Sequence, residues 1–227
     1  MNSKPTPYWK KLWSYIFPVT LETTSSEYND YLEVLMLDGR HQLTTEDAIY
    51  SFDDKYENFN YAFGLINWDR LQGKKVLCLG LGLGSVIYIL EKKCLQDLDY
   101  TAVEIDPEIC RMAHRYTTSQ LESYVEVINA DAEIFLKVNQ EKYDFIIMDI
   151  FQSASIPYKF QSKAFLKKLN SKLLSGGLLM YNRMHLTSQD KSDYSTFLKS
   201  FADIFPDYTE VPVSQNIVII NDKSYLV

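Results

Sequence analysis

Apolar and polar positions alternate in two different ways along this chain, and the change falls near residue 54. Before it, short runs of β-type residues occur at 19–23, 31–37 and 40–43. The pair Asp38-Gly39 separates the last two runs, and such a pair is the strongest short signal of a β-hairpin. We therefore expect residues 1–53 to form a small antiparallel β unit and residues 54–227 to form a second domain.

Beyond residue 54, strand-like and helix-like segments alternate. Residues 54–70 carry apolar side chains at roughly helical spacing. Continuous apolar runs predict strands at 75–80, 99–104, 124–128, 143–149 and 177–182. Segments with helical period predict helices at about 84–94, 107–116, 131–138, 161–173 and 187–203. This alternation predicts a parallel sheet with helices on both faces.

The last part of the chain changes its pattern. Residues 208–213 and 216–220 are two β-type runs separated by two residues, which predicts a closing hairpin with an antiparallel strand. The predicted fold is therefore α/β, a doubly wound and mostly parallel seven-stranded sheet. It resembles the class I methyltransferase fold, preceded by a small N-terminal antiparallel β unit.

A glycine-rich turn follows the first predicted strand of the large domain, in the stretch Lys75–Ser85. Gly80, Gly82 and Gly84 would let the backbone approach a ligand where a Cβ atom would collide. Glu104 ends the next predicted strand, twenty residues after Gly84, where an acid can accept hydrogen bonds from ribose hydroxyls. The spacing predicts a nucleoside site; the structural alternative is a tight turn beside a surface glutamate.

Two further acids follow the next two predicted strands. Asp131, which precedes Ala132, could accept from an adenine amino group or cap the following helix, and one residue could do both. Asp149 ends the run Tyr143–Met148. Because ligands of open α/β sheets bind beyond the carboxyl ends of the strands, Asp149 is the candidate catalytic group. The structural alternative is a loop acid bonded to a helix N-terminus.

Charge and composition exclude several classes of protein. The chain has 227 residues and a net charge of −7, which disfavours electrostatic binding of nucleic acid. Its three cysteines and three histidines show no metal-ligand spacing, so we expect reduced thiols, a cytoplasmic protein and no metal. No apolar run is long enough to span a bilayer. The aromatic and basic stretch 8–17 is expected to pack on the domain or on a second subunit, rather than on a membrane.

The glycine turn also argues against two other nucleotide-binding classes. The sequence Leu79–Ser85 lacks the lysine of a phosphate-binding P-loop, which makes ATP hydrolysis a poor prediction. Its third glycine comes one residue too early for the Gly-x-Gly-x-x-Gly pattern of dinucleotide sites.

These motifs occur in the order found in the spermidine synthase family, and the chain resembles that family over nearly its whole length. The family turn Asp-Gly-x-x-Gln matches Asp38–Gln42 and is followed by Thr44, Glu46 and Asp47. The resemblance implies an aminopropyltransferase-type fold that uses decarboxylated S-adenosylmethionine or the ordinary cofactor. It also implies a homodimer through the N-terminal β unit.

The resemblance assigns roles to individual residues. Glu104 would hold the ribose, while Asp131 and the backbone of Ala132 would hold the adenine. Asp149 would accept a proton from the attacking amine. The acceptor would be contacted by Gln42, Gln152 and Tyr50, although the family tyrosine falls on Ser51 by register.

Two departures from the family lie on the acceptor side. Leu83 replaces an acid that binds the amino group of the decarboxylated cofactor, and Gln152 replaces an acid that holds the diamine. Because a buried cation needs a partner carboxylate, these losses favour methyl transfer to a small acceptor, possibly an amine, over aminopropyl transfer. The alternatives are a spermidine synthase-like aminopropyltransferase, or a catalytically silent homologue that binds a nucleoside or a partner protein.

Overall fold

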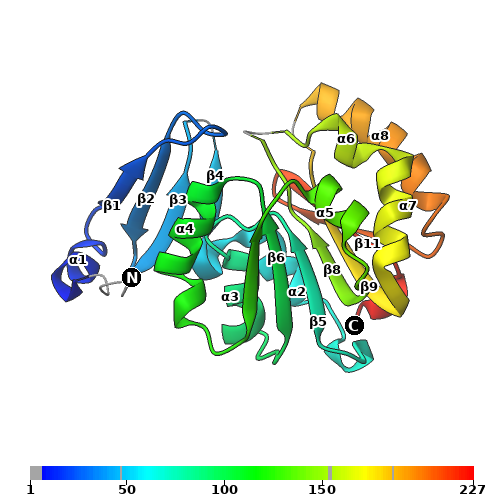
Figure 1. Cartoon of the computed structure of the whole chain (residues 1–227), viewed down its shortest axis with the longest axis horizontal. Helices are drawn as coiled ribbons and strands as arrows, with labels where there is room; N and C mark the ends of the chain where they lie inside the picture. The colour runs from blue at the N-terminus through cyan, green and yellow to red at the C-terminus, as the bar shows by residue number, and fades with distance from the viewer. Residues whose placement is uncertain (1–6, 47, 153–154, 186) are drawn as a thin grey trace.

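The computed structural model describes residues 7–46, 48–152, 155–185 and 187–227, which fold into two β-sheets joined by helices (Figure 1). The strands are β1 (Val19–Thr24), β2 (Leu32–Leu37), β3 (Arg40–Thr44), β4 (Ile49–Phe52), β5 (Lys75–Leu79), β6 (Asp99–Glu104), β7 (Val125–Asn129), β8 (Tyr143–Met148), β9 (Leu173–Met184), β10 (Thr209–Val213) and β11 (Asn216–Ile220). The helices are α1 (Tyr8–Trp13), α2 (Glu57–Phe63), α3 (Ser85–Lys92), α4 (Pro107–Tyr116), α5 (Ala132–Val138), α6 (Tyr158–Gln161), α7 (Lys163–Lys172) and α8 (Ser188–Ala202).

The small sheet is antiparallel in the order β1-β2-β3-β4. The predicted hairpin is confirmed, since Leu37 pairs with Arg40 across the turn. Asp38 and Gly39 have φ values of 51° and 73°, the left-handed geometry that a two-residue hairpin turn requires. The strand β4 was not predicted, because it follows β3 closely and is only four residues long.

The large sheet has the order β10-β11-β9-β8-β5-β6-β7. Its neighbours from β9 to β7 are parallel, while β11 is antiparallel to both β9 and β10. The predicted mostly parallel seven-stranded sheet with a closing hairpin is therefore confirmed.

Three predicted boundaries were wrong. The segment 54–70 contains only a two-turn helix and two short 3₁₀ turns rather than one helical stretch. The helix expected over 161–173 is divided, because the Ser162 side chain accepts a hydrogen bond from the N–H of Phe165 and starts α7 anew. The last central strand begins at Leu173, four residues earlier than predicted.

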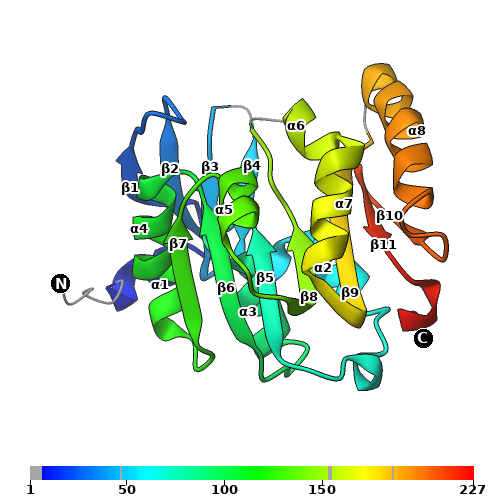
Figure 2. The ribbon, with the colours of Figure 1, turned by 45° about the vertical axis from the view of Figure 1, so that its right-hand side comes forward.

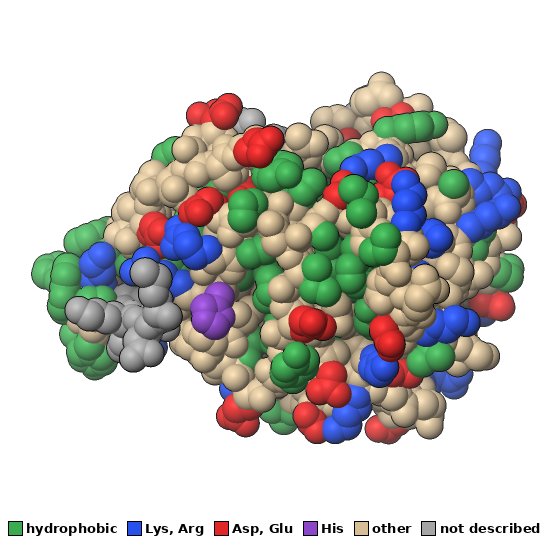
Figure 3. Space-filling model, viewed as in Figure 1, with side chains coloured by type: hydrophobic (Ala, Val, Ile, Leu, Met, Phe, Trp, Pro, Cys, Tyr) green, Lys and Arg blue, Asp and Glu red, His purple; other side chains and the backbone are tan. Residues whose placement is uncertain are grey.

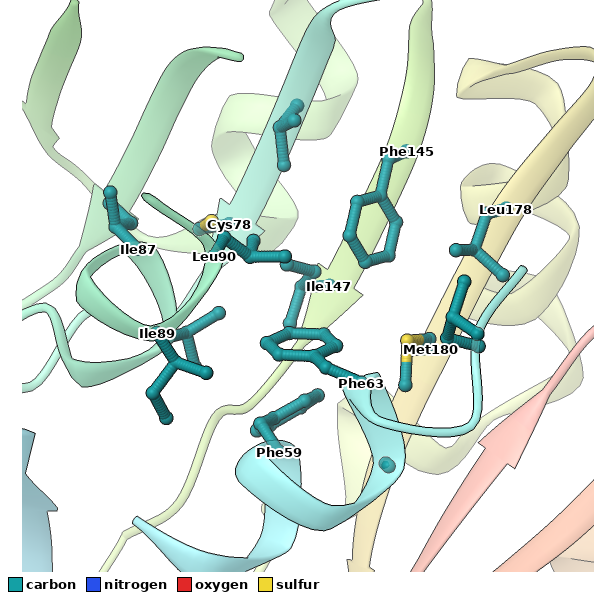
Figure 4. Close-up of a cluster of buried hydrophobic side chains, with 14 of the residues drawn as sticks. Phe59, Phe63, Cys78, Ile87, Ile89, Leu90, Phe145, Ile147, Leu178 and Met180 are labelled. Carbon is teal, nitrogen blue, oxygen red and sulfur yellow. The ribbon is translucent and has the colours of Figure 1, made fainter. Parts of the chain in front are cut away.

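Helices cover the large sheet on both faces (Figure 2). On one face, Phe59 and Phe63 of α2 pack with side chains of α3 on Cys78, Ile147 and neighbouring strand residues (Figure 4). On the other face, α5, α7 and α8 pack on alternate residues of the same strands. Because both faces are buried, the central strands read as continuous apolar runs.

The small sheet is attached to the large domain through α4. Leu32, Val34 and Leu43 pack against Ile109 and Met112. Arg111, Arg115 and Tyr116 of α4 also donate hydrogen bonds to the Glu22 carboxylate of β1. We propose the domain boundary after residue 53, since β4 ends at Phe52 and the following helix α2 packs under the large sheet.

Candidate active site

A cavity of about 870 Å³ lies at the carboxyl ends of the parallel strands. Its other wall belongs to the small sheet and is formed by β3, β4 and the loop between β1 and β2. It is lined on the large-domain side by Gly80, Leu81, Gly82, Val103, Glu104, Ile105, Asp106, Ala130, Asp131, Ala132, Asp149, Ile150, Phe151, Gln152, Pro157, Lys159 and Phe160. Tyr28, Asn29, Thr44, Thr45, Glu46, Ala48, Ile49 and Tyr50 line the wall of the small sheet, and Tyr56, Asn58, Met184, Gln215 and Asn216 complete it.

The glycine turn packs closely against other backbone segments, and its predicted approach to a ligand stays a prediction. Gly80 has a φ of +88°, and a Cβ there would lie 2.4 Å from the carbonyl oxygen of Asp149. Gly82 has a φ of +53°, and a Cβ there would lie 3.0 Å from the carbonyl oxygen of Tyr50. Gly84 starts α3 and faces the methyl groups of two threonines, so this third predicted cofactor residue does not line the cavity.

Glu104 lies at the end of β6 and joins two loops of the cavity wall. Its Oε2 accepts a hydrogen bond from the N–H of Leu81 at 3.1 Å, and its Oε1 accepts one from the N–H of Asp106 at 3.1 Å. Burial raises the pKa of this carboxyl above its usual range, although those N–H groups oppose the shift. Each carboxylate oxygen can accept a further hydrogen bond, which suits a ribose diol.

Asp131 caps the helix α5, as one of the two interpretations of its sequence position predicted. Its Oδ1 accepts hydrogen bonds from the N–H groups of Glu133 and Ile134 at 2.8 and 3.1 Å. Its Oδ2 forms an ion pair with the ammonium of Lys159. Burial opposes ionisation, but the ammonium and the helix N–H groups outweigh it and lower the pKa of Asp131. Ala132 follows at the first position of α5 and lines the cavity.

Asp149 is buried in a polar network at the centre of the cavity wall. The Tyr56 hydroxyl lies 3.1 Å from Oδ1 and 3.0 Å from Oδ2 of Asp149. Asn182 of β9 donates to Oδ1 at 2.8 Å, and Asn216 of β11 donates to the Oδ1 of Asn182 at 2.9 Å. Burial raises the pKa of Asp149 to about 6, and the bonds from Asn182 and Tyr56 partly oppose that shift. A carboxyl with this pKa can accept a proton near neutral pH.

Of the three residues predicted on the acceptor side, Tyr50 and Gln152 line the cavity and Gln42 does not. Gln42 is 6% exposed on β3 and does not line the cavity. Tyr50 does line it, while the hydroxyl of Ser51 is turned inward and lies 2.6 Å from that of Ser85. The cause is a β-bulge: Leu43 pairs with Ser51 but Thr44 pairs with Ile49, so Tyr50 is an extra residue in the strand.

Leu83 also lies elsewhere than expected. Its side chain is fully buried against Leu32, Val34 and Leu43 of the small sheet and does not line the cavity. The position therefore contributes apolar packing between the domains, not an apolar contact to a ligand. Gln152 lines the cavity, whereas Asp47 and residues 153–154 lie outside the described residues.

Sequence reasoning missed three polar members of the site. Tyr56 was counted as part of an apolar helix face, and Lys159 lay inside a segment without a motif. Asn182 could have been found, because it is a polar residue directly after the apolar run 178–181 of a predicted central strand. A polar side chain buried in such a strand needs a partner, and its partner is Asp149.

Two absences hold for the described residues. No group of three metal-ligand side chains is found among them. Likewise, no helix in the described part of the chain is long and apolar enough to cross a bilayer.

The sheet order, the position of the cavity and the glycine turn define a protein of the class I methyltransferase fold. Within that class, the family model described as "Spermine/spermidine synthase domain" matches residues 63–220. The chain therefore belongs to the spermine/spermidine synthase family.

Individual relatives agree with this assignment. A polyamine aminopropyltransferase of Vibrio vulnificus is 29% identical over 135 residues, which are 58% of this chain and 45% of that protein. An N-terminal histidine N-methyltransferase of Emericella nidulans is 29% identical over 141 residues, which are 59% of this chain and 24% of that protein. The matched regions thus span less than half the length of these curated relatives.

A solved structure shows the same fold. The structure of a probable spermidine synthase from Corynebacterium glutamicum superimposes with a TM-score of 0.71 at 18% identity. The superposition covers 88% of this chain and 78% of that one. The covered share exceeds the length of the large domain, so the likeness extends into the N-terminal β unit.

Proposed function

We propose that this chain is a transferase that uses S-adenosylmethionine or a close relative, with Asp149 as the group that receives the acceptor's proton. The supporting observation is the buried Asp149, whose pKa is about 6, in the same cavity as the glycine turn and Glu104. Such a cofactor, when bound, supplies a sulfonium whose attached carbon is open to nucleophilic attack. The residues of the chain orient the acceptor and exclude water.

The cavity fits the nucleoside part of such a cofactor. Gly80 and Gly82 line the cavity, so a ligand there can lie directly against their backbone. Glu104 would accept from the ribose hydroxyls with the lone pairs left by its two N–H bonds. Asp131 would share its Oδ2 between Lys159 and an adenine amino group.

Methyl transfer is favoured over aminopropyl transfer by the charges on the acceptor side. Gln152 supplies an amide where the family has an acid, and Asn58, Gln215 and Asn216 add further neutral amides. A diamine has two ammonium groups, and each loses hydration on binding. The free-energy cost of that loss is offset only where a carboxylate pairs with the ammonium. Asp149 can pair with one of the two ammonium groups. We therefore propose a small acceptor that has at most one cationic group and whose neutral amine or hydroxyl is the nucleophile once Asp149 has received its proton.

Aminopropyl transfer is the second candidate, and Glu46 is the observation in its favour. This carboxylate lines the same cavity from the small sheet and could pair with the second ammonium of a diamine. The curated polyamine aminopropyltransferase relatives support the same reading by likeness. A catalytically silent nucleoside-binding homologue is the third.

Calorimetry separates these candidates. The protein is titrated with S-adenosylmethionine, decarboxylated S-adenosylmethionine and methylthioadenosine. Methyl transfer predicts that the first binds more tightly than the second, and aminopropyl transfer predicts the reverse. Methylthioadenosine, which has the nucleoside alone, should bind in both cases. Binding of none of the three would overturn the proposal.

Two predictions about the whole molecule are proposals as well. We propose a homodimer through the small sheet, since β1 is an edge strand; sedimentation velocity tests it. We also propose a cytoplasmic location, which agrees with three cysteines that form no disulfide.

A further inference from the structure

The segment 8–17 exposes seven large apolar side chains. Their exposed fractions run from 48% to 75%, and the residues are Tyr8, Trp9, Leu12, Trp13, Tyr15, Ile16 and Phe17. We call them the α1 patch. The expectation that this segment packs on the domain holds for Ser14, which is fully buried, but not for the residues of α1, none of which is buried. In Figure 3 the patch is the group of green side chains at the end of the molecule that carries α1.

The patch is held firmly although its apolar side chains point outward. Ser14 is fully buried and is the anchor. Its hydroxyl accepts a hydrogen bond from the N–H of Gly39 at 2.9 Å, and its carbonyl accepts one from the N–H of Asp38 at 2.9 Å. The β2–β3 turn thus fixes the position of the segment. The apolar side chains of the α1 patch therefore point into solvent from a fixed support. A frayed chain end, in contrast, is free to turn its apolar groups away from water.

The size of the patch calls for a partner. Five aromatic rings, each with about 150–250 Å² of surface and about half of it exposed, give an apolar area on the order of 500 Å². That lies near the upper end of the largest apolar patches on monomeric proteins, and such patches commonly mark interaction sites.

The composition of the patch fits the interface of a lipid bilayer. Tryptophan and tyrosine have an apolar body and a polar edge, and they concentrate at the level of the lipid headgroups. Lys10 and Lys11 lie between the aromatic residues, and the Lys10 ammonium lies 5.9 Å from the ring centroid of Trp9. No acidic residue occurs within 8–17. Lysines beside inserted aromatic rings attract anionic headgroups.

The shape of the tip favours a membrane over a second copy of the chain. Figures 1 and 2 show α1 at an end of the molecule, beside the ends of β1 and β2. In a two-fold dimer the same patch must meet itself. Two protruding tips would then touch over a small area and bring Lys10 and Lys11 against their own copies, whereas lysine is depleted in protein interfaces. A bilayer can enclose a protruding tip and offers the opposite charge.

We propose that the α1 patch inserts into the headgroup region of a bilayer and prefers anionic lipid. The insertion holds the protein at a membrane surface without spanning it. The contact is independent of the cavity, whose lining includes no residue of 8–17.

The test is flotation of the full chain with vesicles of phosphatidylcholine alone or mixed three to one with phosphatidylglycerol. We expect binding to the anionic vesicles at roughly tenfold lower lipid concentration, from two lysines at about 1 kcal/mol each or somewhat less. Emission of Trp9 and Trp13 should shift to shorter wavelength. The double variant Trp9→Ser/Trp13→Ser should lose binding, and Lys10→Glu/Lys11→Glu should lose the preference for anionic lipid.

Tyr61→Ser/Tyr124→Ser is the matched control, since both tyrosines are more than half exposed elsewhere on the surface. It should bind vesicles like the unchanged chain. Failure of the unchanged chain to bind, or equal binding by the tryptophan variant, overturns the proposal. The proposal is also overturned if sedimentation without lipid shows a dimer that the tryptophan variant converts to a monomer, because the patch is then an interface between copies.

Discussion

The hydroxyl of Tyr56 lies within hydrogen-bond distance of both carboxylate oxygens of Asp149, at 3.1 and 3.0 Å. Tyr56 is the residue before α2, and Asp149, which is 93 positions further along the chain, is the residue after β8. The phenol therefore fixes the plane of the carboxylate while the asparagine behind it, Asn182, fixes one oxygen. Both partners favour the ionised form, and burial opposes it.

We predict that Tyr56→Phe raises the pKa of Asp149 further. The lost bond stabilised the charged carboxylate, and a hydrogen bond to a charged group contributes about 1.5–3 kcal/mol, so the rise should be about one unit. The measurement is a pH titration of the Asp149 carboxyl carbon by NMR in labelled protein. Any activity that needs the ionised form should then begin at correspondingly higher pH.

Tyr61→Phe is the control for this experiment. Tyr61 lies on α2, the helix that follows Tyr56, but is 55% exposed. The pH titration of Asp149 should therefore be unchanged in this variant. An unchanged midpoint in Tyr56→Phe would show that the phenol does not act on the carboxylate in solution.

Asp149 should also reduce the stability of the fold at neutral pH. Its pKa in the folded protein is about 6, above the ordinary 3.8, so the folded state binds its proton more tightly than the unfolded state does. Stability from this group is therefore greatest at low pH and falls as pH rises from about 4 to about 6. The shift of roughly two units corresponds to about 3 kcal/mol as an upper figure.

We accordingly predict that Asp149→Asn is more stable than the unchanged chain at pH 7.5, by up to about 3 kcal/mol. The difference should shrink at pH 4.5, where the unchanged carboxyl is protonated. Urea unfolding at both pH values measures it. A variant less stable at pH 7.5 would show that the network around Asp149 outweighs its burial.

The positions of the central strands along the chain could be predicted because their sequence pattern is local. Runs such as 145–148 are apolar on both faces, and only a strand covered on both sides needs that. The positions of Glu104 and Asp149 followed, since strand ends in a parallel sheet meet at one edge.

Tyr50 and Gln152 on the acceptor side were predicted, but the places of Gln42 and Leu83 were not, because they depend on contacts between distant segments. A single bulged residue exchanges the roles of Tyr50 and Ser51, and no residue type marks that bulge. The side chain of Leu83 turns toward the small sheet because Leu32 and Leu43 receive it there. Tyr56, the partner of Asp149, precedes α2 and is 93 positions away, so only the packing of that helix under the sheet brings the two together.

We predict that Gly80→Ala destabilises the fold by several kcal/mol more than Gly176→Ala. Both glycines have left-handed backbone, with φ values of +88° and +73°, so both substitutions add strain of about 1–2 kcal/mol. Only at Gly80 would the new Cβ also meet a backbone oxygen, at 2.4 Å; nothing lies within 4 Å at Gly176. Thermal and urea unfolding of the two variants measure the difference. Equal losses would mean that the turn moves away freely, which contradicts a fixed wall beside Asp149.

The last prediction restores the acid that the family has at position 152. Gln152→Asp places a second carboxylate on the wall of the cavity that Asp149 lines. In the presence of methylthioadenosine, 1,4-diaminobutane should then bind roughly tenfold more tightly, because its second ammonium gains a charge partner. Calorimetry measures the change. Gln140→Asp adds the same charge outside the cavity lining and should leave the affinity unchanged. If the unchanged chain already binds the diamine as tightly as the variant does, Gln152 does not limit diamine binding, and the aminopropyl candidate replaces methyl transfer.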